Sequence, residues 1–344
     1  INMMLVTGQI GRELCGIAPP RGQNNVQGAT DVGCSPILYP GYIPASDVEN
    51  RQRIAALWRL PFDDLPGEPG LSTVEIMHAA YDGEVRGLYV MGENPLVTDP
   101  NLNHTRQAIE NLEFLVVQDI FETETTRFAD VVLPAASFAE KDGTFVNSDR
   151  RVLRVRKAVE SPGEARADWE ILLDIASRMG ADIGNYRSSG QIFDEIARAA
   201  PIFGGITYDR IERQGIQWPC PTPDHGGTPT LFLDGFSTPN RKAILNPVEH
   251  TEGDERPSKQ FPLILNSGRV LYQYHSATMS RKNDWLNSFS NASYLLMNRE
   301  DVKKHGLTDG DTVCVENERG ALTTTLRESV EVAPGEMFMP WHFS

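Results

Sequence analysis

The sequence lacks several features that would assign it to common protein classes. It has no run of about 18 apolar residues, the length that a membrane-spanning helix needs. It also lacks GxGxxG and the P-loop, so neither an ordinary NAD site nor a kinase-like phosphate cradle is supported. Basic residues are few, with 32 Lys and Arg against 47 Asp and Glu and a formal net charge of -15. Nucleic acids and acidic membranes bind positive surfaces, so we expect neither as a partner. Any anionic ligand must then be held by local arginines or backbone amides.

Cysteine is scarce and scattered. The four residues Cys15, Cys34, Cys220 and Cys314 form no CxxC pair, which disfavours a structural zinc site and a self-contained iron-sulfur site. Free thiols in a reducing compartment are favoured over a disulfide framework.

The chain has the length and the apolar content that a folded protein needs. With 344 residues, 40% of them hydrophobic, it is long enough for two or three packing units, and intrinsic disorder is disfavoured. We expect no signal peptide. Residues 1–6 resemble a buried element entered partway, which predicts an internal piece of a longer polypeptide.

A loop rich in glycine and proline covers residues 8–42 and leaves no room for a long helix or strand. Its middle, residues 21–33, has the sequence RGQNNVQGATDVG, in which amide side chains alternate with glycines that let a backbone approach a ligand closely. A ligand-binding loop and a surface loop whose polar groups satisfy one another both fit this composition.

Helices and short apolar strands alternate from residue 72 onward. Ser72 and Glu75 form a capping box for a helix that Gly83 ends, and Asp99 is expected to cap a second helix with Pro100 at its first position. Apolar strands are predicted at 88–91, 114–117 and 131–133, covered on both faces. This order predicts a right-handed parallel unit. The polar strand ends at 92–94, 118–119 and 133–135 then share the edge where such sheets bind ligands, although ordinary loops remain an alternative.

The second half of the chain changes in character. Helices are predicted from Asp168 to Gly180 and over 192–199, and residues 214–257 form a connection and boundary. Strands at 263–265, 312–316, 322–326 and 337–339, with a helix at 299–305, predict a small barrel-like β domain.

Five segments together resemble one enzyme family. They are RGQNNVQGATD at 21–31, MGENPL at 91–96, VQDIF at 117–121, ADVVLP at 129–134 and PWHF at 340–343. The resemblance, which covers essentially the whole chain, is to the catalytic subunit of molybdenum- or tungsten-dependent formate dehydrogenases, in the dimethyl sulfoxide reductase family. It implies an α/β fold, with a parallel-sheet nucleotide-binding domain that has helices on both faces and a small β-barrel-like C-terminal domain. The implied ranges are 1–23 for the end of an upstream α/β domain, 24–137 for a guanine-dinucleotide-binding domain, 138–257 for a mixed helical region and connection, and 258–344 for an incomplete molybdopterin dinucleotide-binding barrel.

The family holds Mo or W between two molybdopterin guanine dinucleotides, and the resemblance assigns cofactor contacts by position. They are Gln23, Gly92, Glu93, Asn94, Thr98, Gln118, Asp119, Ile120, Leu133, Ala135, Asp168, Arg269, Leu271, Tyr272, Tyr274, His275 and Trp341. Asp168 would bind the adjacent N–H donors of guanine, although a helix N-cap at this position needs no ligand. Tyr272 and Tyr274 suit barrel packing equally well, and His275 equally suits a solvated loop.

Arg21 is the residue to which the resemblance assigns catalysis, because an arginine at this motif position orients the formate carboxylate beside the metal. A surface salt bridge is the alternative for this residue. The implied reaction is the two-electron oxidation of formate to carbon dioxide, or its reverse. The implied partners are the rest of the same subunit and electron-transfer subunits that carry iron-sulfur clusters or flavin, in the cytoplasm.

The departures from the family concern what lies outside residues 1–344. The cysteine or selenocysteine metal ligand, the adjacent histidine and the iron-sulfur cysteines are expected upstream, so no metal ligand is assigned here and the chain alone is expected to be inactive. Two rival functions remain. One is a relative with the same cofactors that acts on nitrate, arsenite or another oxyanion, which the Arg21 loop disfavours. The other is a cofactor-free scaffold like the large iron-sulfur subunit of respiratory complex I.

Overall fold

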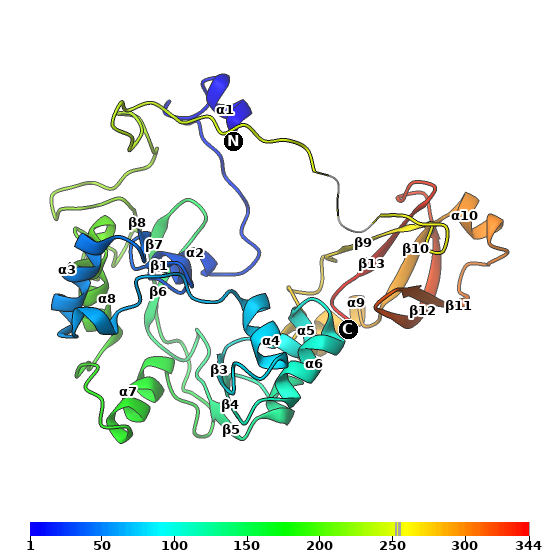
Figure 1. Cartoon of the computed structure of the whole chain (residues 1–344), viewed down its shortest axis with the longest axis horizontal. Coiled ribbons are helices and arrows are strands. Elements are labelled where there is room, and N and C mark those ends of the chain that lie inside the picture. The colour runs from blue at the N-terminus through cyan, green and yellow to red at the C-terminus, as the bar shows by residue number, and fades with distance from the viewer. Residues whose placement is uncertain (252, 254–255, 344) are drawn as a thin grey trace. The chain divides into compact units, whose positions relative to one another are not determined.

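The computed structural model describes residues 1–251, 253 and 256–343 (Figure 1). The other four residues fall within the predicted connection and the last predicted domain, outside the described part of the chain. The chain divides into two units. The first comprises Ile1–Ile76, Gln118–Ile120 and Leu133–Val248, and the second comprises Met77–Val117, Phe121–Val132 and Glu249–Ser344. The four domain ranges implied by the resemblance stay predictions.

The first unit combines short helices with an antiparallel sheet. Its elements are α1 (Asn2–Val6), α2 (Val26–Asp31), β1 (Leu38–Tyr39), β2 (Ile43–Pro44), α3 (Val48–Trp58), η1 (Phe62–Asp64), β6 (Gly143–Val146), β7 (Arg151–Val155), α7 (Asp168–Arg178), α8 (Ser189–Ala199), η3 (Pro201–Phe203) and β8 (Ile216–Gln217). Strands β6, β7 and β8 pair antiparallel, and Val146 and Val152 pack there against Phe193 and Phe203. This sheet was not predicted, because charged residues interrupt the alternation in its short strands.

Helix α1 corrects one expectation. Its apolar neighbours Ile1, Met3 and Val6 are 83%, 76% and 67% exposed, so residues 1–6 are not a buried element in this structure. None of the four core clusters in the described chain includes them.

A three-stranded sheet carries the predicted nucleotide-binding edge. Its order is β3 (Gly87–Met91), β4 (Phe114–Asp119) and β5 (Val131–Pro134). The strands run parallel, as predicted, since Asp130 N–H donates to Leu115 O and Ala135 N–H donates to Asp119 O. One face packs against α4 (Thr73–Tyr81) and α6 (Leu102–Glu110). The predicted capping box starts α4, where Ser72 N–H donates to Glu75 Oε2 at 2.7 Å.

Two details of this region differ from expectation. The strands are not buried on both faces, because Tyr89, Met91 and Phe114 are 38%, 47% and 51% exposed on the face that α4 and α6 do not cover. Asp99 does not start the second helix. It ends the short helix α5 (Pro95–Thr98), and Asn101 caps α6 in the left-handed conformation (φ 56°), which breaks the helix between Pro100 and Leu102.

The C-terminal sheet is mixed and five-stranded. Its order is β11 (Thr312–Asn317), β12 (Gly320–Ser329), β10 (Tyr294–Asn298), β13 (Glu336–Pro340) and β9 (Ile264–Gly268). Pairs β10–β12 and β9–β13 are parallel, and β10–β13 and β11–β12 are antiparallel. The helical elements in the same part of the chain are η4 (Ser280–Lys282), α9 (Asp284–Phe289) and α10 (Arg299–Lys304), whereas η2 (Thr125–Phe128) lies between β4 and β5. The predicted strands, the helix and the α/β class are confirmed, but the central strand β10 was missed, since a short apolar run does not distinguish a strand from a helix.

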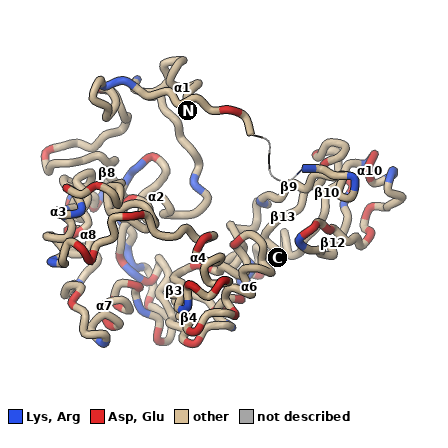
Figure 2. The backbone as a smooth tube through the Cα atoms, viewed as in Figure 1, with Lys and Arg blue, Asp and Glu red and all other residues tan. Residues whose placement is uncertain are grey.

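No helix among the described residues is long and apolar enough to cross a lipid bilayer. Lys and Arg positions are interspersed with Asp and Glu along both units (Figure 2). All four cysteines are free thiols, as predicted.

Candidate functional site

Arg21 belongs to a cluster of polar side chains in the first unit. We call Arg21, Gln27, Asp31, Tyr42 and Trp218 the Arg21 cluster. The exposed Arg21 donates from Nη2 to Gln27 Oε1 at 2.7 Å. Gln27 Nε2 lies 2.7 Å from Asp31 Oδ1 and 2.7 Å from the Tyr42 hydroxyl. The structure therefore connects Arg21 to a buried carboxylate through one amide.

Asp31 is the centre of this cluster and has no exposed surface. The Tyr42 hydroxyl donates to its Oδ1 and Trp218 Nε1 donates to its Oδ2, each at 2.7 Å. Burial raises the Asp31 pKa above its ordinary value, and the three hydrogen bonds and the Arg21 charge offset only part of that rise. Burial and the Asp31 hydrogen bond raise the pKa of Tyr42 to about 12, so its hydroxyl stays a donor at neutral pH. Gln23, which follows Arg21 closely, is exposed.

Asp168 contacts Gln118 at the end of β4, which also belongs to the first unit. Gln118, which is fully buried, donates from Nε2 to Asp168 Oδ1 at 2.7 Å, and Lys141 Nζ forms an ion pair with Asp168 Oδ2. The N-cap of α7 is Ala167, so Asp168 is the first residue of the helix and not its cap. The carboxylate is thus turned towards the strand end, and the N-cap alternative does not apply to it.

The remaining strand-end residues of this unit differ in their exposure. Ala135 N–H donates to Asp119 O, which joins the ends of β4 and β5. Ala135 is buried, Leu133 is half-buried and Ile120 is 37% exposed. Gln118, Asp119 and Ala135 are therefore brought together, as the parallel order predicted, and Asp168 joins them through Gln118.

The first strand end lies in the second unit, where Asn94 is the organising residue. Gly92 has a φ of 66°, and a Cβ at this position would meet no atom within 4 Å. Asn94 is 3% exposed and donates to Glu124 Oε2 at 2.8 Å and to Thr278 Oγ1 at 3.3 Å. Thr98 donates to Glu93 Oε1, so the two flanking predicted residues contact each other.

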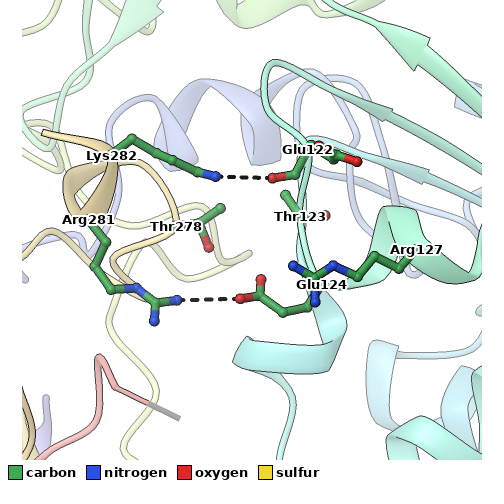
Figure 3. A pocket seen from close by; sticks show the side chains of 7 residues that line it. All are labelled: Glu122, Thr123, Glu124, Arg127, Thr278, Arg281 and Lys282. Atoms are coloured by element: carbon green, nitrogen blue, oxygen red, sulfur yellow. Dashed lines mark hydrogen bonds and ion pairs between the residues drawn. The ribbon is translucent and has the colours of Figure 1, made fainter.

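A cavity of about 180 Å³ adjoins Asn94 in the second unit. Figure 3 shows that Arg281 and Arg127 approach Glu124 from opposite sides, with an Arg281–Glu124 separation of 3.7 Å. Burial raises the Glu124 pKa, but the Asn94 hydrogen bond and the two arginines outweigh it and hold the pKa below its usual range. This network fixes the Asn94 loop to residues 278–282.

The predicted pterin segment at 269–275 is held by His342. Val270 N–H donates to His342 Nε2 at 2.9 Å, and His342 Nδ1 contacts the His275 carbonyl. A ring that accepts at Nε2 and donates at Nδ1 is neutral, and burial, the leading cause, lowers the His342 pKa. Trp341 lies edge-on to His275 at 5.0 Å, and the Arg269 guanidinium lies 5.8 Å from the Trp341 ring.

The other residues of this segment point to different surroundings. Tyr272 stacks on Phe289 at 4.6 Å, which favours the packing alternative for Tyr272. Leu271 is 88% exposed and Tyr274 is 37% exposed. His275 has a φ of 49°, and its buried Nδ1 has no hydrogen-bond partner among the described residues.

Comparison with known proteins decides the family. The molybdopterin oxidoreductase family matches residues 1–178, and the Molydopterin dinucleotide binding domain matches residues 263–344. The chain belongs to the molybdopterin oxidoreductase family. Its dinucleotide-binding domain supports a molybdopterin cofactor.

Proteins similar to this chain are named for different substrates. F420-dependent formate dehydrogenase 2 subunit alpha from Methanococcus maripaludis is 43% identical over 343 residues, which are 99% of this chain and 50% of that protein. The assimilatory nitrate reductase catalytic subunit from Bacillus subtilis is 36% identical over 352 residues, 100% of this chain and 49% of that protein. The chain thus spans about half the length of these curated relatives. Acetylene hydratase from Pelobacter acetylenicus has the same fold, with a TM-score of 0.62 over 86% of this chain and 42% of that chain at 18% identity.

The residues of this chain fit the cofactor chemically. The unpartnered His275 Nδ1 is a buried polar atom that a ligand in the predicted pterin segment can satisfy. The Asp168 carboxylate offers acceptor oxygens of the kind that the paired N–H groups of guanine would need, and the Arg269 guanidinium has the charge that a phosphate would need. Gly92 leaves open space for close approach by a ligand.

Sequence reasoning missed five residues that organise these sites: Gln27, Asp31, Lys141, Glu124 and His342. Gln27 and Asp31 lie inside the resembling motif, and their spacing of four residues places them on one face of a helix. That spacing is the signal that would have identified the pair. Glu124 and Lys141 carry no comparable local signal, because their partners lie far along the chain. His342 lies inside the resembling segment at 340–343, but its partners are also distant.

Proposed function

We propose that this chain is part of the catalytic subunit of a formate dehydrogenase, which removes two electrons from formate to form carbon dioxide at a bis(molybdopterin guanine dinucleotide) centre. When bound, that cofactor supplies a Mo or W ion that takes up the two electrons. We further propose electron-transfer partner subunits with iron-sulfur clusters or flavin, an iron-sulfur cluster outside residues 1–344, and a cytoplasmic location.

The observation that carries this proposal is that Arg21 has N–H donors left for a ligand. A guanidinium has five N–H donors, and among the described residues only Gln27 accepts a hydrogen bond from Arg21. Donors therefore remain for both oxygens of a carboxylate. Formate has almost no apolar area, so charge and paired hydrogen bonds must supply most of its binding and orientation.

Cofactor contacts complete the proposal. We assign the guanine edge to Asp168, oriented by Gln118 and Lys141, and the adjoining strand ends to Asp119, Ile120, Leu133 and Ala135. We assign the second-unit contacts to Gly92, Glu93, Asn94 and Thr98, to Arg269, Leu271, Tyr272, Tyr274 and His275, and to Trp341. Gln23 is assigned to the pterin or substrate pocket.

A nitrate reductase is the second candidate, because a nitrate reductase subunit is 36% identical to this chain. Nitrate also carries a negative charge on oxygens that a guanidinium binds. Formate is favoured because the relative at 43% identity is a formate dehydrogenase subunit. Assay of the holoenzyme with each substrate separates the two.

Arg21→Ala in the holoenzyme tests the substrate assignment. We expect kcat/KM for formate to fall by at least ~100-fold with metal and pterin content near normal, because the carboxylate loses its paired donors. Arg21→Lys should recover only part of the loss, since an ammonium attracts formate without fixing its rotation.

Arg12→Ala is the matched control, because Arg12 is also exposed in the same loop and contacts Gln9 and Cys15 only among the described residues. It should leave kcat/KM unchanged. Unchanged formate kinetics in Arg21→Ala, or a loss that follows pterin loss, would remove Arg21 from substrate binding.

Asp168→Ala in the holoenzyme tests the guanine assignment. Hydrogen bonds to a charged group contribute about 1.5–3 kcal/mol each, so we expect cofactor affinity to fall about tenfold or more, measured as pterin content after dialysis. Asp174→Ala is the control, because Asp174 lies on the same helix but pairs with Arg166 and Arg178. Full pterin content in Asp168→Ala would count against the assignment.

A further inference from the structure

The exposed position of Arg21 does not by itself hold the side chain in one orientation. Its side chain is exposed, and a free arginine side chain has about 2 kcal/mol of rotamer entropy to lose when it is held in one orientation. The bond from Nη2 to Gln27 Oε1 supplies one fixed point. The direction in which the Gln27 amide faces therefore decides whether Arg21 meets an acceptor or a donor.

A glutamine amide can turn over within the same space, because its oxygen and nitrogen are nearly the same size. In this structure its direction is determined by Asp31, since a carboxylate accepts hydrogen bonds and donates none. The Tyr42 hydroxyl reinforces this choice. It donates its proton to Asp31, so it can only accept from Gln27. The amide nitrogen must face Asp31 and Tyr42, and the amide oxygen must face Arg21.

We propose that Asp31 is a positioning residue for Arg21, which it holds in place by setting the direction of the Gln27 amide. This inference rests on the proposed function for its catalytic meaning. Asp31 acts on Arg21 through Gln27, with the attraction between the two charges in addition, and touches no substrate.

The backbone around the pair supports this role. Gln27 and Asp31 lie one helical turn apart on α2 (Val26–Asp31). Asn25, which precedes α2, accepts from Val146 N–H at 2.9 Å and so ties the helix to β6. A Cβ on Gly28 would lie 2.2 Å from Asn25 Oδ1, so only glycine fits between them. Trp218 Nε1 secures the other oxygen of Asp31 at 2.7 Å. The carboxylate is thus held from both sides.

Asp31→Asn is the decisive change, because it keeps the shape and adds a donor. An asparagine NH2 facing Gln27 turns the Gln27 amide over, which then presents its own NH2 to Arg21. Two donors then face each other and Arg21 is released. The first readout is labelling of Arg21 in the holoenzyme by an arginine-specific 1,2-dicarbonyl reagent, measured by peptide mass spectrometry. We expect several-fold faster labelling of Arg21 and no change at Arg12.

The second readout is formate kinetics. Asp31→Asn should lower kcat/KM about tenfold or more, by misplacing Arg21. In an Arg21→Ala background the same change should alter kcat/KM by less than about twofold, because the residue through which Asp31 acts is gone. Asp149→Asn is the control, since Asp149 also accepts from a glutamine, Gln217 at 3.2 Å, but does not contact Arg21.

The double variant Gln27→Glu with Asp31→Asn restores an acceptor that faces Arg21. The introduced carboxylate can accept hydrogen bonds both from the introduced asparagine amide and from Arg21. Its Arg21 labelling should return to the slow rate of the unchanged protein. If Asp31→Asn fails to fold, Gln27→Leu tests the same contact and should also speed labelling.

The two readouts separate this inference from the proposed function. Unchanged Arg21 labelling in Asp31→Asn and Gln27→Leu would overturn the positioning role, whatever the kinetics. Faster labelling with unchanged formate kinetics would support the positioning of Arg21 by Asp31 and reject the formate assignment.

Discussion

The Arg21 cluster of the first unit and the His342 contact of the second both hold a loop through a buried polar side chain, but they differ in charge. Asp31 is an acceptor on which three donors converge, with Arg21 as a countercharge. His342 is a neutral ring that bridges two backbone groups, accepting from Val270 and donating to His275. A buried anion must be enclosed by donors, whereas a neutral imidazole needs one donor and one acceptor.

This difference has a consequence for what each contact tolerates. Loss of one member of the Asp31 arrangement leaves several buried groups without partners. Protonation of His342 would break this contact, because a charged imidazole has no acceptor at Nε2. The charged ring would also face Arg269 and Arg281, whose charges, after burial, lower the His342 pKa. The first contact is therefore sensitive to substitution and the second to acid.

The larger effect is expected from Asp31→Ala. This change leaves the buried donors of Tyr42, Trp218 and Gln27 unpaired, which should lower the free energy of unfolding of the first unit by about 3 kcal/mol or more. Hydrogen exchange of residues 26–42 and chemical denaturation measure it. Tyr42→Phe removes one donor and should cost about 1 kcal/mol. A smaller loss for Asp31→Ala than for Tyr42→Phe would show that Asp31 is not the centre of the cluster.

A smaller effect is expected from acid on the His342 contact. The pKa of His342 is lowered on folding, so below the usual histidine pKa of about 6.5 the unfolded chain binds a proton that the folded loop excludes. Stability is then full above about pH 7.5 and is lost as the pH falls through 6.5 towards the lowered pKa, by about 1.4 kcal/mol for each unit of the shift. Hydrogen exchange of residues 268–276 at pH 7.5 and 5.5, corrected for the intrinsic exchange rate, measures this loss.

His342→Gln is the matched variant for that measurement. A glutamine can accept from Val270 through its oxygen but does not titrate, so most of the acid sensitivity should disappear. His275→Gln is the second control, because burial, the Arg269 charge and the His342 charge also lower the His275 pKa. If His342→Gln kept the full acid sensitivity and His275→Gln removed it, His275 would be the titrating group.

Local residues determined some elements of this fold, but not the sheet of β6, β7 and β8 or the strand β10. The capping box of Ser72 and Glu75 predicted the start of α4, and Gly83, at a φ of 77°, ends that helix as expected. The capping box and the helix-ending glycine depend on residues within one helical turn, so both can be read without knowledge of the tertiary contacts. The Asp99 prediction failed for a related reason. The capping residue type was present, but the left-handed conformation of Asn101 moved the helix start.

The order of strands and helices also predicted the α/β class and the meeting of the β4 and β5 ends, because parallel strands joined by helices place their carboxyl ends together. The candidate residues themselves came from the family resemblance, which assigned them by position in its motifs. The exposed face of Tyr89 and Phe114 could not be foreseen, since apolar residues alone do not reveal what covers them.

Only the tertiary structure decided which side chains meet. Trp218 lies 187 residues from Asp31, His275 lies 67 residues from His342, and Asp168 lies 50 residues from Gln118. A buried polar group must find its partner wherever the folded chain places a donor or acceptor, and sequence separation does not constrain that choice. The sequence by itself therefore determined many of the elements, the family resemblance and Arg21 as a candidate, whereas folding decided that Asp31 contacts Arg21 through Gln27 and that His342 holds residues 270–275.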